Sequence, residues 1–236
     1  MKKLNYVILF IFILSATDML ADHRNFVWTY QYMTMEPGKT EFELYHTLSA
    51  TDPSHFETTG SNELNMEFEI GMTPHFDFAI YQVFQAANDG KINYGGFKLR
   101  SRYKIGNKND FWLDPLIYLE YSANANFTEQ EIEPKLILAK DIGNFKFSFN
   151  PYLSIEKGKG EWEFEPNYAF GACYEVSKLF GIGLEAKGNK DGNYIGPTIS
   201  HGSEKAWFSF SVVHSIGTPE ATHPKLQARL ILGLEL

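Results

Sequence analysis

Four cationic side chains alternate along one short segment, and this spacing would place four positive charges close together. Lys98, Arg100, Arg102 and Lys104 are each separated by one residue. Alternate residues of a β-strand share a face, so all four would present charge to the same side. If that side faces water, the stripe would line an ion path, as charged side chains do in channels. If carboxylates on neighbouring strands pair with the stripe, it would brace the fold instead, and the sequence leaves both interpretations open.

One motif invites a catalytic interpretation, the tripeptide His201-Gly202-Ser203. A serine nucleophile needs a base, and the base needs an orienting partner. Outer-membrane lipid hydrolases are similar in using a His-x-Ser pair with a polar residue further on. The following strand offers serines and a histidine, but no Asn, Asp or Glu at its middle. We therefore expect a turn histidine and no enzyme, with a lipid-modifying hydrolase as the alternative.

The sequence supports neither a metal site nor a cofactor site. The seven histidines are scattered without metal-ligand spacing, and neither a P-loop nor a GxSxG motif is present. Cys173 is the only cysteine, so no internal disulfide can form. We expect no catalytic residue, no metal and no cofactor.

The elements that position these residues follow a period of two. From Leu64 to Met72 every second residue is apolar, and polar residues or glycine lie between them. Similar segments of about ten residues recur along the chain, and this is the length that a tilted strand needs to cross a bilayer. The pattern is typical of outer-membrane barrels, which alternate apolar and polar faces. It predicts an all-β, antiparallel up-and-down transmembrane β-barrel of about twelve strands with a polar lumen.

The first residues have the parts of a secretory signal peptide, which we place at 1–21. Lys2 and Lys3 precede an apolar stretch, residues 7–14, and Ala21 offers a small residue for cleavage. Cleavage there removes two lysines and one aspartate, which takes the formal net charge from −8 to −9. This acidity argues against nucleic acid as a partner. The leader and the strand pattern together predict the outer membrane of a Gram-negative bacterium.

Turn chemistry and strand count predict the topology. Short connections alternate with longer ones, as periplasmic turns and outer loops do in bacterial barrels. Thirteen strand-like segments can be read: 26–35, 40–49, 62–72, 76–86, 94–105, 113–122, 129–140, 145–156, 161–176, 180–187, 194–201, 206–216 and 225–236. The last twelve would close an even barrel over 40–236 with both ends in the periplasm. Segment 26–35 is then left over, so we expect residues 22–39 in or near the barrel mouth or lumen.

Sorting the strands by parity separates apolar side chains, assigned to the lipid, from charged ones, assigned to the lumen. A lipocalin-like barrel would invert these faces, and periodicity alone does not exclude it. Twelve strands favour the membrane barrel, because lipocalins have eight. The lumen-lining residues that we single out are Glu67, Glu69, Asp77, Lys98, Arg100, Arg102, Lys104, Glu120 and Arg229.

The mature chain resembles small, uncharacterised outer-membrane barrel proteins labelled porins or transporters, and distantly the barrel group associated with phenol-degradation operons. The resemblance lies in the leader, in Pro37-Gly38-Lys39, and in the stretches MEFEIGMTPHFDFAIYQVF and KLRSRYKIG. It implies a porin-like channel or transporter for small solutes. The implied partners are outer-membrane lipid, a small solute and the barrel-assembly machinery, with no statement on oligomeric state. A non-conducting structural barrel is the remaining alternative.

Overall fold

A computed structural model describes residues 23–86, 91–157, 160–203 and 205–236 of the 236-residue chain. The expected signal peptide, residues 1–21, lies outside this part. No helix in the described part is long and apolar enough to cross a membrane.

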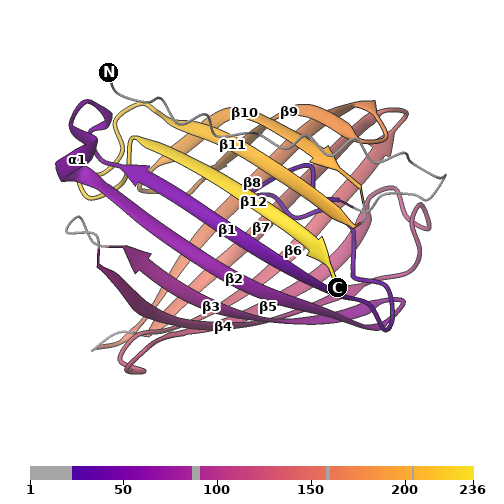
Figure 1. Cartoon of the computed structure of the whole chain (residues 1–236), viewed down its shortest axis with the longest axis horizontal. Helices are drawn as coiled ribbons and strands as arrows, with labels where there is room; N and C mark the ends of the chain where they lie inside the picture. Colours follow the sequence, from indigo (N-terminus) through magenta and orange to yellow (C-terminus); the bar gives the residue numbers. More distant parts are fainter. Residues whose placement is uncertain (1–22, 87–90, 158–159, 204) are drawn as a thin grey trace, which may run out of the picture.

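Twelve strands form one closed, antiparallel up-and-down barrel, as the sequence predicted. Each strand pairs with the next in the chain, and β1 pairs with β12 to close the ring, from Glu41 opposite Glu235 to Ala50 opposite Leu226. Figure 1 shows these two strands side by side. The strands are β1 Thr40–Ala50, β2 Gly60–Thr73, β3 Phe76–Ala86, β4 Ile92–Lys104, β5 Asp114–Asn124, β6 Gln130–Ile142, β7 Phe145–Lys157, β8 Trp162–Ser177, β9 Phe180–Gly188, β10 Asn193–Gly202, β11 Ala206–Ile216 and β12 Leu226–Glu235.

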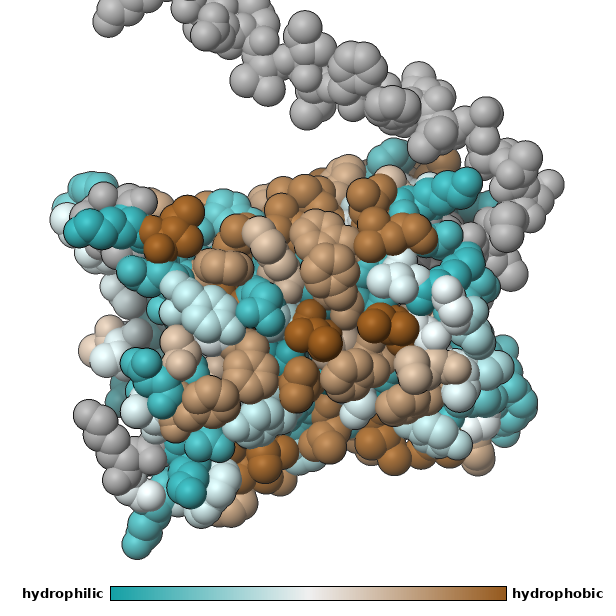
Figure 2. Space-filling view, turned by 60° about the horizontal axis from the view of Figure 1, so that its bottom comes forward, coloured by the Kyte–Doolittle hydropathy of each residue, from teal (hydrophilic) through white to brown (hydrophobic). Residues whose placement is uncertain are grey.

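The outer wall is apolar and the inner wall carries most of the ionisable groups. On β2, Phe68 is 47% exposed, while its neighbours Glu67 and Glu69 are buried inside the barrel. On β7, Phe145 and Phe149 are exposed in the same way. Apolar side chains extend across the middle of the wall in Figure 2, with polar ones gathered toward its two ends. This is the surface that a lipid bilayer requires, and it removes the inverted, lipocalin-like arrangement.

The two ends of the barrel differ. One end carries the tight turns at 74–75, 143–144 and 178–179 and both chain ends of the barrel, and we call it the short-turn end. The other, the long-loop end, carries the connection with the short helices η1 (Pro53–His55) and α1 (Phe56–Thr59). One connection at the short-turn end is longer than the sequence suggested. Residues 105–113 form no strand there, because Asn109 turns with a positive φ of 70° and its N–H donates to Asp114.

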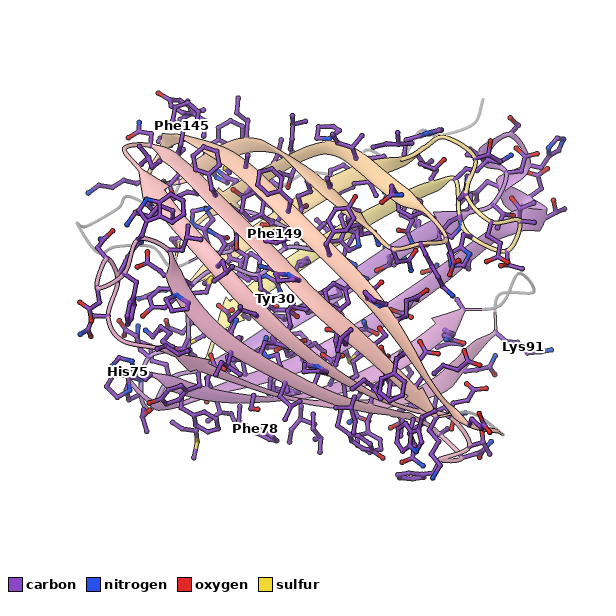
Figure 3. All side chains as sticks on the ribbon, turned by 180° about the vertical axis from the view of Figure 1, so that it is seen from behind. Tyr30, His75, Phe78, Lys91, Phe145 and Phe149 are labelled. Carbon is purple, nitrogen blue, oxygen red and sulfur yellow. The ribbon has the colours of Figure 1, made fainter. Side chains whose placement is uncertain are left out.

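Residues 26–35 form no strand, although their composition is strand-like. We call residues 23–35 the inner segment, because their hydrogen bonds run to inward-facing side chains of several wall strands. Phe26, Val27 and Thr29 are almost fully buried. In Figure 3, Tyr30 lies between the walls, while Phe78 and Phe145 project from the outer surface. The inner segment then leads through the Pro37-Gly38 turn into β1.

Candidate functional site

The most buried charged cluster inside the barrel joins β2, β3 and β4. Arg100 pairs with Glu67 at 2.9 Å and with Glu69 at 2.6 Å. Arg102 pairs with Asp77 at 2.5 Å and also contacts Glu69. All five side chains are almost completely excluded from solvent. At this level the basic stripe therefore braces the wall, which is the pairing interpretation that the sequence left open.

Strand register explains why these charges meet. Arg102 lies directly opposite Asp77 across the β3–β4 ladder. Glu69 and Arg100 both lie opposite Ala79, from the two sides of β3. Because Ala79 is small, the long side chains above and below it can reach each other.

The other two residues of the stripe lie toward the two ends. Lys98 pairs with Glu120 at 3.0 Å, and the Tyr118 hydroxyl donates to the same carboxylate at 2.6 Å. Lys104 lies near the short-turn end, with its ammonium 5.9 Å from the centre of the Tyr32 ring. The structure thus places all of the singled-out residues from β2 to β5 on the inner face, but most of them bind each other.

The inner segment contributes one cation to this cluster. Arg24 donates to the Tyr45 hydroxyl at 2.6 Å and lies 3.5 Å from Glu43. The Tyr45 hydroxyl in turn donates to Glu67 at 2.7 Å. Buried carboxylates outnumber buried guanidinium groups in this region: Glu41, Glu43, Glu67, Glu69 and Asp77 face Arg24, Arg100 and Arg102. Arg24 therefore compensates negative charge that the wall itself leaves in excess.

A single wall carboxylate holds the tip of the inner segment. Glu185 on β9 accepts three successive backbone N–H groups, from Val27 at 3.0 Å, Trp28 at 2.9 Å and Thr29 at 2.9 Å. Successive amides that point to one side make a concave anion site. Glu185 is 1% exposed, so these bonds are shielded from water. The charged acceptor makes them stronger than neutral hydrogen bonds.

Further contacts hold the inner segment on either side of this tip. The Tyr30 amide donates to Asn150 Oδ1 at 2.6 Å, and Asn150 Nδ2 donates back to the Tyr30 carbonyl at 3.0 Å. Phe26 packs on Gly171, where an added Cβ would lie 2.7 Å from the ring. These contacts occupy the wall from β7 to β9, opposite the arginine cluster.

The sequence reasoning missed the residues that hold the inner segment, although a signal was present. Many inward positions of β8 to β11 are small, with Gly171 and Gly181 among them, whereas many of those of β2 to β4 are long and charged. Small inward side chains on one wall leave space that another part of the chain must fill. Glu185 is the carboxylate that lies fully buried in this wall among the described residues.

Arg229 lies apart from the arginine cluster. Its Nε donates to Thr47 Oγ1 at 2.8 Å, and its guanidinium lies 5.6 Å from the centre of the Trp28 ring.

Two cavities open near the ends of the barrel. The one at the short-turn end has a volume of about 510 Å³ and includes Lys104, and the one at the long-loop end has about 290 Å³ and includes Lys98.

The His201-Gly202-Ser203 motif lies at the short-turn end, next to the turn between β10 and β11. His201 is exposed on the outer wall, with its ring 6.3 Å from that of Phe180 and 5.9 Å from that of Phe208. In the described part of the chain, no hydrogen bond joins its imidazole to Ser203 or to an orienting carboxylate. No group of three His, Cys, Asp or Glu residues in that part could hold a metal ion.

Comparisons with known proteins find the fold alone. No family model matches the chain, and no curated protein matches its sequence. An outer-membrane channel of Pseudomonas putida F1 superposes with a TM-score of 0.64 at 12% identity, covering 87% of this chain and 98% of that one. The KdgM porin, solved with disordered oligogalacturonate, gives 0.57 at 9% identity, covering 83% and 97%. Outer membrane phospholipase A of Escherichia coli gives 0.51 at 10% identity, covering 86% and 98%. The barrel therefore has the fold of bacterial outer-membrane channels and porins, a fold that a lipase also shares.

Proposed function

We propose that this protein is an outer-membrane channel for small polar solutes, in which the inner segment narrows the pore. The observation that carries the proposal is a closed twelve-strand barrel with an apolar outer wall and ionisable side chains inside. The likeness to the Pseudomonas channel and the KdgM porin supports the same role. The long loops would then face the cell exterior and the short turns the periplasm.

The lumen-lining residues take different parts in this proposal. The buried cluster around Arg100 holds the wall and leaves little room for ions. Lys98, Lys104 and Arg229 are only half-buried, so solutes entering from the two ends can meet their charges. The inner segment lies between these two regions and sets the narrowest part of the path.

Recording from planar bilayers tests the proposal. The purified full-length protein should give discrete, low-conductance steps that are absent from the bilayer alone. A barrel that stays folded yet never conducts would favour the non-conducting structural alternative.

A lipid hydrolase is the second candidate, because phospholipase A shares the fold and His201 lies on the outer wall. We propose that the chain is not an enzyme, since His201 contacts two phenylalanine rings and no orienting acid. Phospholipid vesicles incubated with the protein should release no fatty acid above background. Release that disappears in both His201→Ala and Ser203→Ala would establish the hydrolase instead.

A further inference from the structure

Two cations inside the barrel, Lys187 and Arg229, have no carboxylate partner among the described residues. The ammonium of Lys187 on β9 lies 4.8 Å from the centre of the Trp28 ring and 5.7 Å from that of Tyr194. Arg229 on β12 lies over the same Trp28 ring and donates one hydrogen bond to Thr47. In the described part of the chain neither forms an ion pair.

The other inner cations show how unusual this is. Arg100 and Arg102 pair with buried carboxylates, and Lys98, Lys135 and Lys146 each pair with at least one. The sequence supplies enough acidic residues to pair more, since Asp and Glu number 29 against 21 Lys and Arg. Lys187 and Arg229 therefore keep free N–H donors, whereas these other cations direct theirs at carboxylates.

Two neutral donors in the same place are also unsatisfied. The Nε1 of Trp28 and the hydroxyl of Tyr194 are buried and have no hydrogen-bond partner among the described residues. Trp28 is 8% exposed and Tyr194 is 5% exposed, so few water molecules reach either side chain. Buried polar atoms without a protein partner are costly, so each of these two donors has capacity for a hydrogen bond to water or to a ligand.

Nearby carboxylates are already engaged by other groups. Glu185 accepts the three amides of the inner segment. Glu63 accepts a hydrogen bond from Asn65 Nδ2 at 3.1 Å. Neither carboxylate forms an ion pair with Lys187 or Arg229 within the described residues, so the charges of the two cations are not directly compensated there.

We propose that Lys187 and Arg229 bind the carboxylate of a small organic anion, whose body lies against Trp28 and Tyr194. This assignment rests on the proposed channel function and adds a solute class to it. Both cations are half-buried, so water and solutes can reach them. Lys187 lies one residue before the end of β9 at the long-loop end, so the site would be approached from that side. Guanidinium and ammonium groups bind carboxylates through charge-assisted hydrogen bonds, and the rings favour a flat apolar body.

Tryptophan fluorescence of the full-length protein in detergent tests the site with benzoate as the probe. Benzoate should give a saturable change, and benzamide, its neutral analogue of similar shape, should bind at least tenfold more weakly. The variant Trp28→Phe should lose the response, which assigns the signal to this ring. An equal response to benzamide, or no saturable response to benzoate, would overturn the proposal.

Charge variants give the second arm. Lys187→Met and Arg229→Met should each weaken benzoate binding at least tenfold, whereas Lys146→Met, which removes a cation paired with Asp141, should not. If a variant does not fold, the unchanged protein can be titrated at about 1 M salt, where the Debye length is about 3 Å. The high salt should weaken the binding of benzoate but not that of benzamide. Equal affinity in the two site variants and the control would contradict the site.

Bilayer recordings on the same samples separate the two proposals. Conductance without benzoate binding would refute the anion site and leave the channel standing. Benzoate binding without conductance would refute the channel and leave a binding site in a closed barrel.

Discussion

Replacing Glu185 by glutamine should release the tip of the inner segment while keeping the side chain's shape. In the structure one carboxylate oxygen accepts the amides of Trp28 and Thr29, and the other accepts that of Val27. Glutamine keeps one acceptor oxygen and turns a donor NH₂ toward the third position. The loss is therefore one hydrogen bond outright, together with the charge that strengthened the other two.

The magnitude follows from the number of bonds. A hydrogen bond to a charged group contributes about 1.5–3 kcal/mol and a neutral one about 0.5–1.5 kcal/mol. A loss of about 1 kcal/mol for each of three bonds gives about 3 kcal/mol, which is about a hundredfold in the ratio of docked to released segment. Glu185→Gln should accordingly leave the barrel folded and make the segment accessible far more often.

Amide hydrogen exchange of Val27, Trp28 and Thr29 measures this directly. Their protection should fall by about a hundredfold in Glu185→Gln, in line with about 1.4 kcal/mol for each tenfold change. Glu175→Gln is the matched control, because Glu175 on the neighbouring strand pairs with Lys146 at 3.3 Å and, among the described residues, forms no hydrogen bond with the inner segment. Unchanged protection in Glu185→Gln, or an equal loss in the control, would refute the anchoring role.

Three further perturbations test the packing of the barrel interior. Arg100→Met leaves buried Glu67 without its cation and Glu69 with Arg102 alone, so the urea midpoint should fall by an amount equivalent to about 3–5 kcal/mol, and by less in Lys98→Met, whose lysine is partly exposed. Burial lowers the pKa of His23 from 6.5 to about 4, so the docked segment should resist protonation that the released segment accepts. Docking should therefore be strongest above about pH 6.5 and weaken as the pH falls toward 4, as measured by limited proteolysis, and His23→Gln should reduce this dependence. Gly171→Val places a side chain where Phe26 packs, so the segment should become more sensitive to protease at a cost of about 1–3 kcal/mol; unchanged sensitivity would show that this contact is loose.

The barrel could be predicted from the sequence because a two-residue period has only one consistent placement beside lipid. Once Phe68 faces outward, Glu67 and Glu69 must face inward. The same alternation determines which side chains of the other strands face the lipid and which face the lumen. The number of strands followed from the alternation of short turns with longer loops, which requires an even count.

The pairing of the inner charges could not be predicted from one strand at a time. Arg100 reaches Glu69 because the register of β3 places small Ala79 between them. Periodicity sets the face of a residue but not its position along the barrel relative to the next strand. The sequence therefore allowed a water-lined basic stripe, which in the structure is largely neutralised.

The inner segment shows the limit of composition as a guide to structure. Phe26, Trp28 and Tyr30 suit a strand, yet the backbone N–H of Trp28 donates to Glu185 and that of Tyr30 donates to Asn150 instead of to a neighbouring strand. Side chains of the wall accept the backbone N–H groups that a neighbouring strand would accept in a sheet. No local sequence pattern predicts this. The inner segment also explains Ile231, an apolar residue on the otherwise polar inner face of β12. Ile231 packs in the buried cluster that contains Trp28.

The conductance of a variant lacking residues 22–35, recorded beside the full-length protein, tests the central claim most directly. No wall strand is lost, so the barrel should still migrate anomalously on gels until heated. Removal of the segment opens the middle of the lumen to water, so the variant should give clearly larger single-channel steps. A folded variant whose conductance equals that of the full-length protein, or that conducts nothing, would contradict a channel narrowed by its own N-terminal residues.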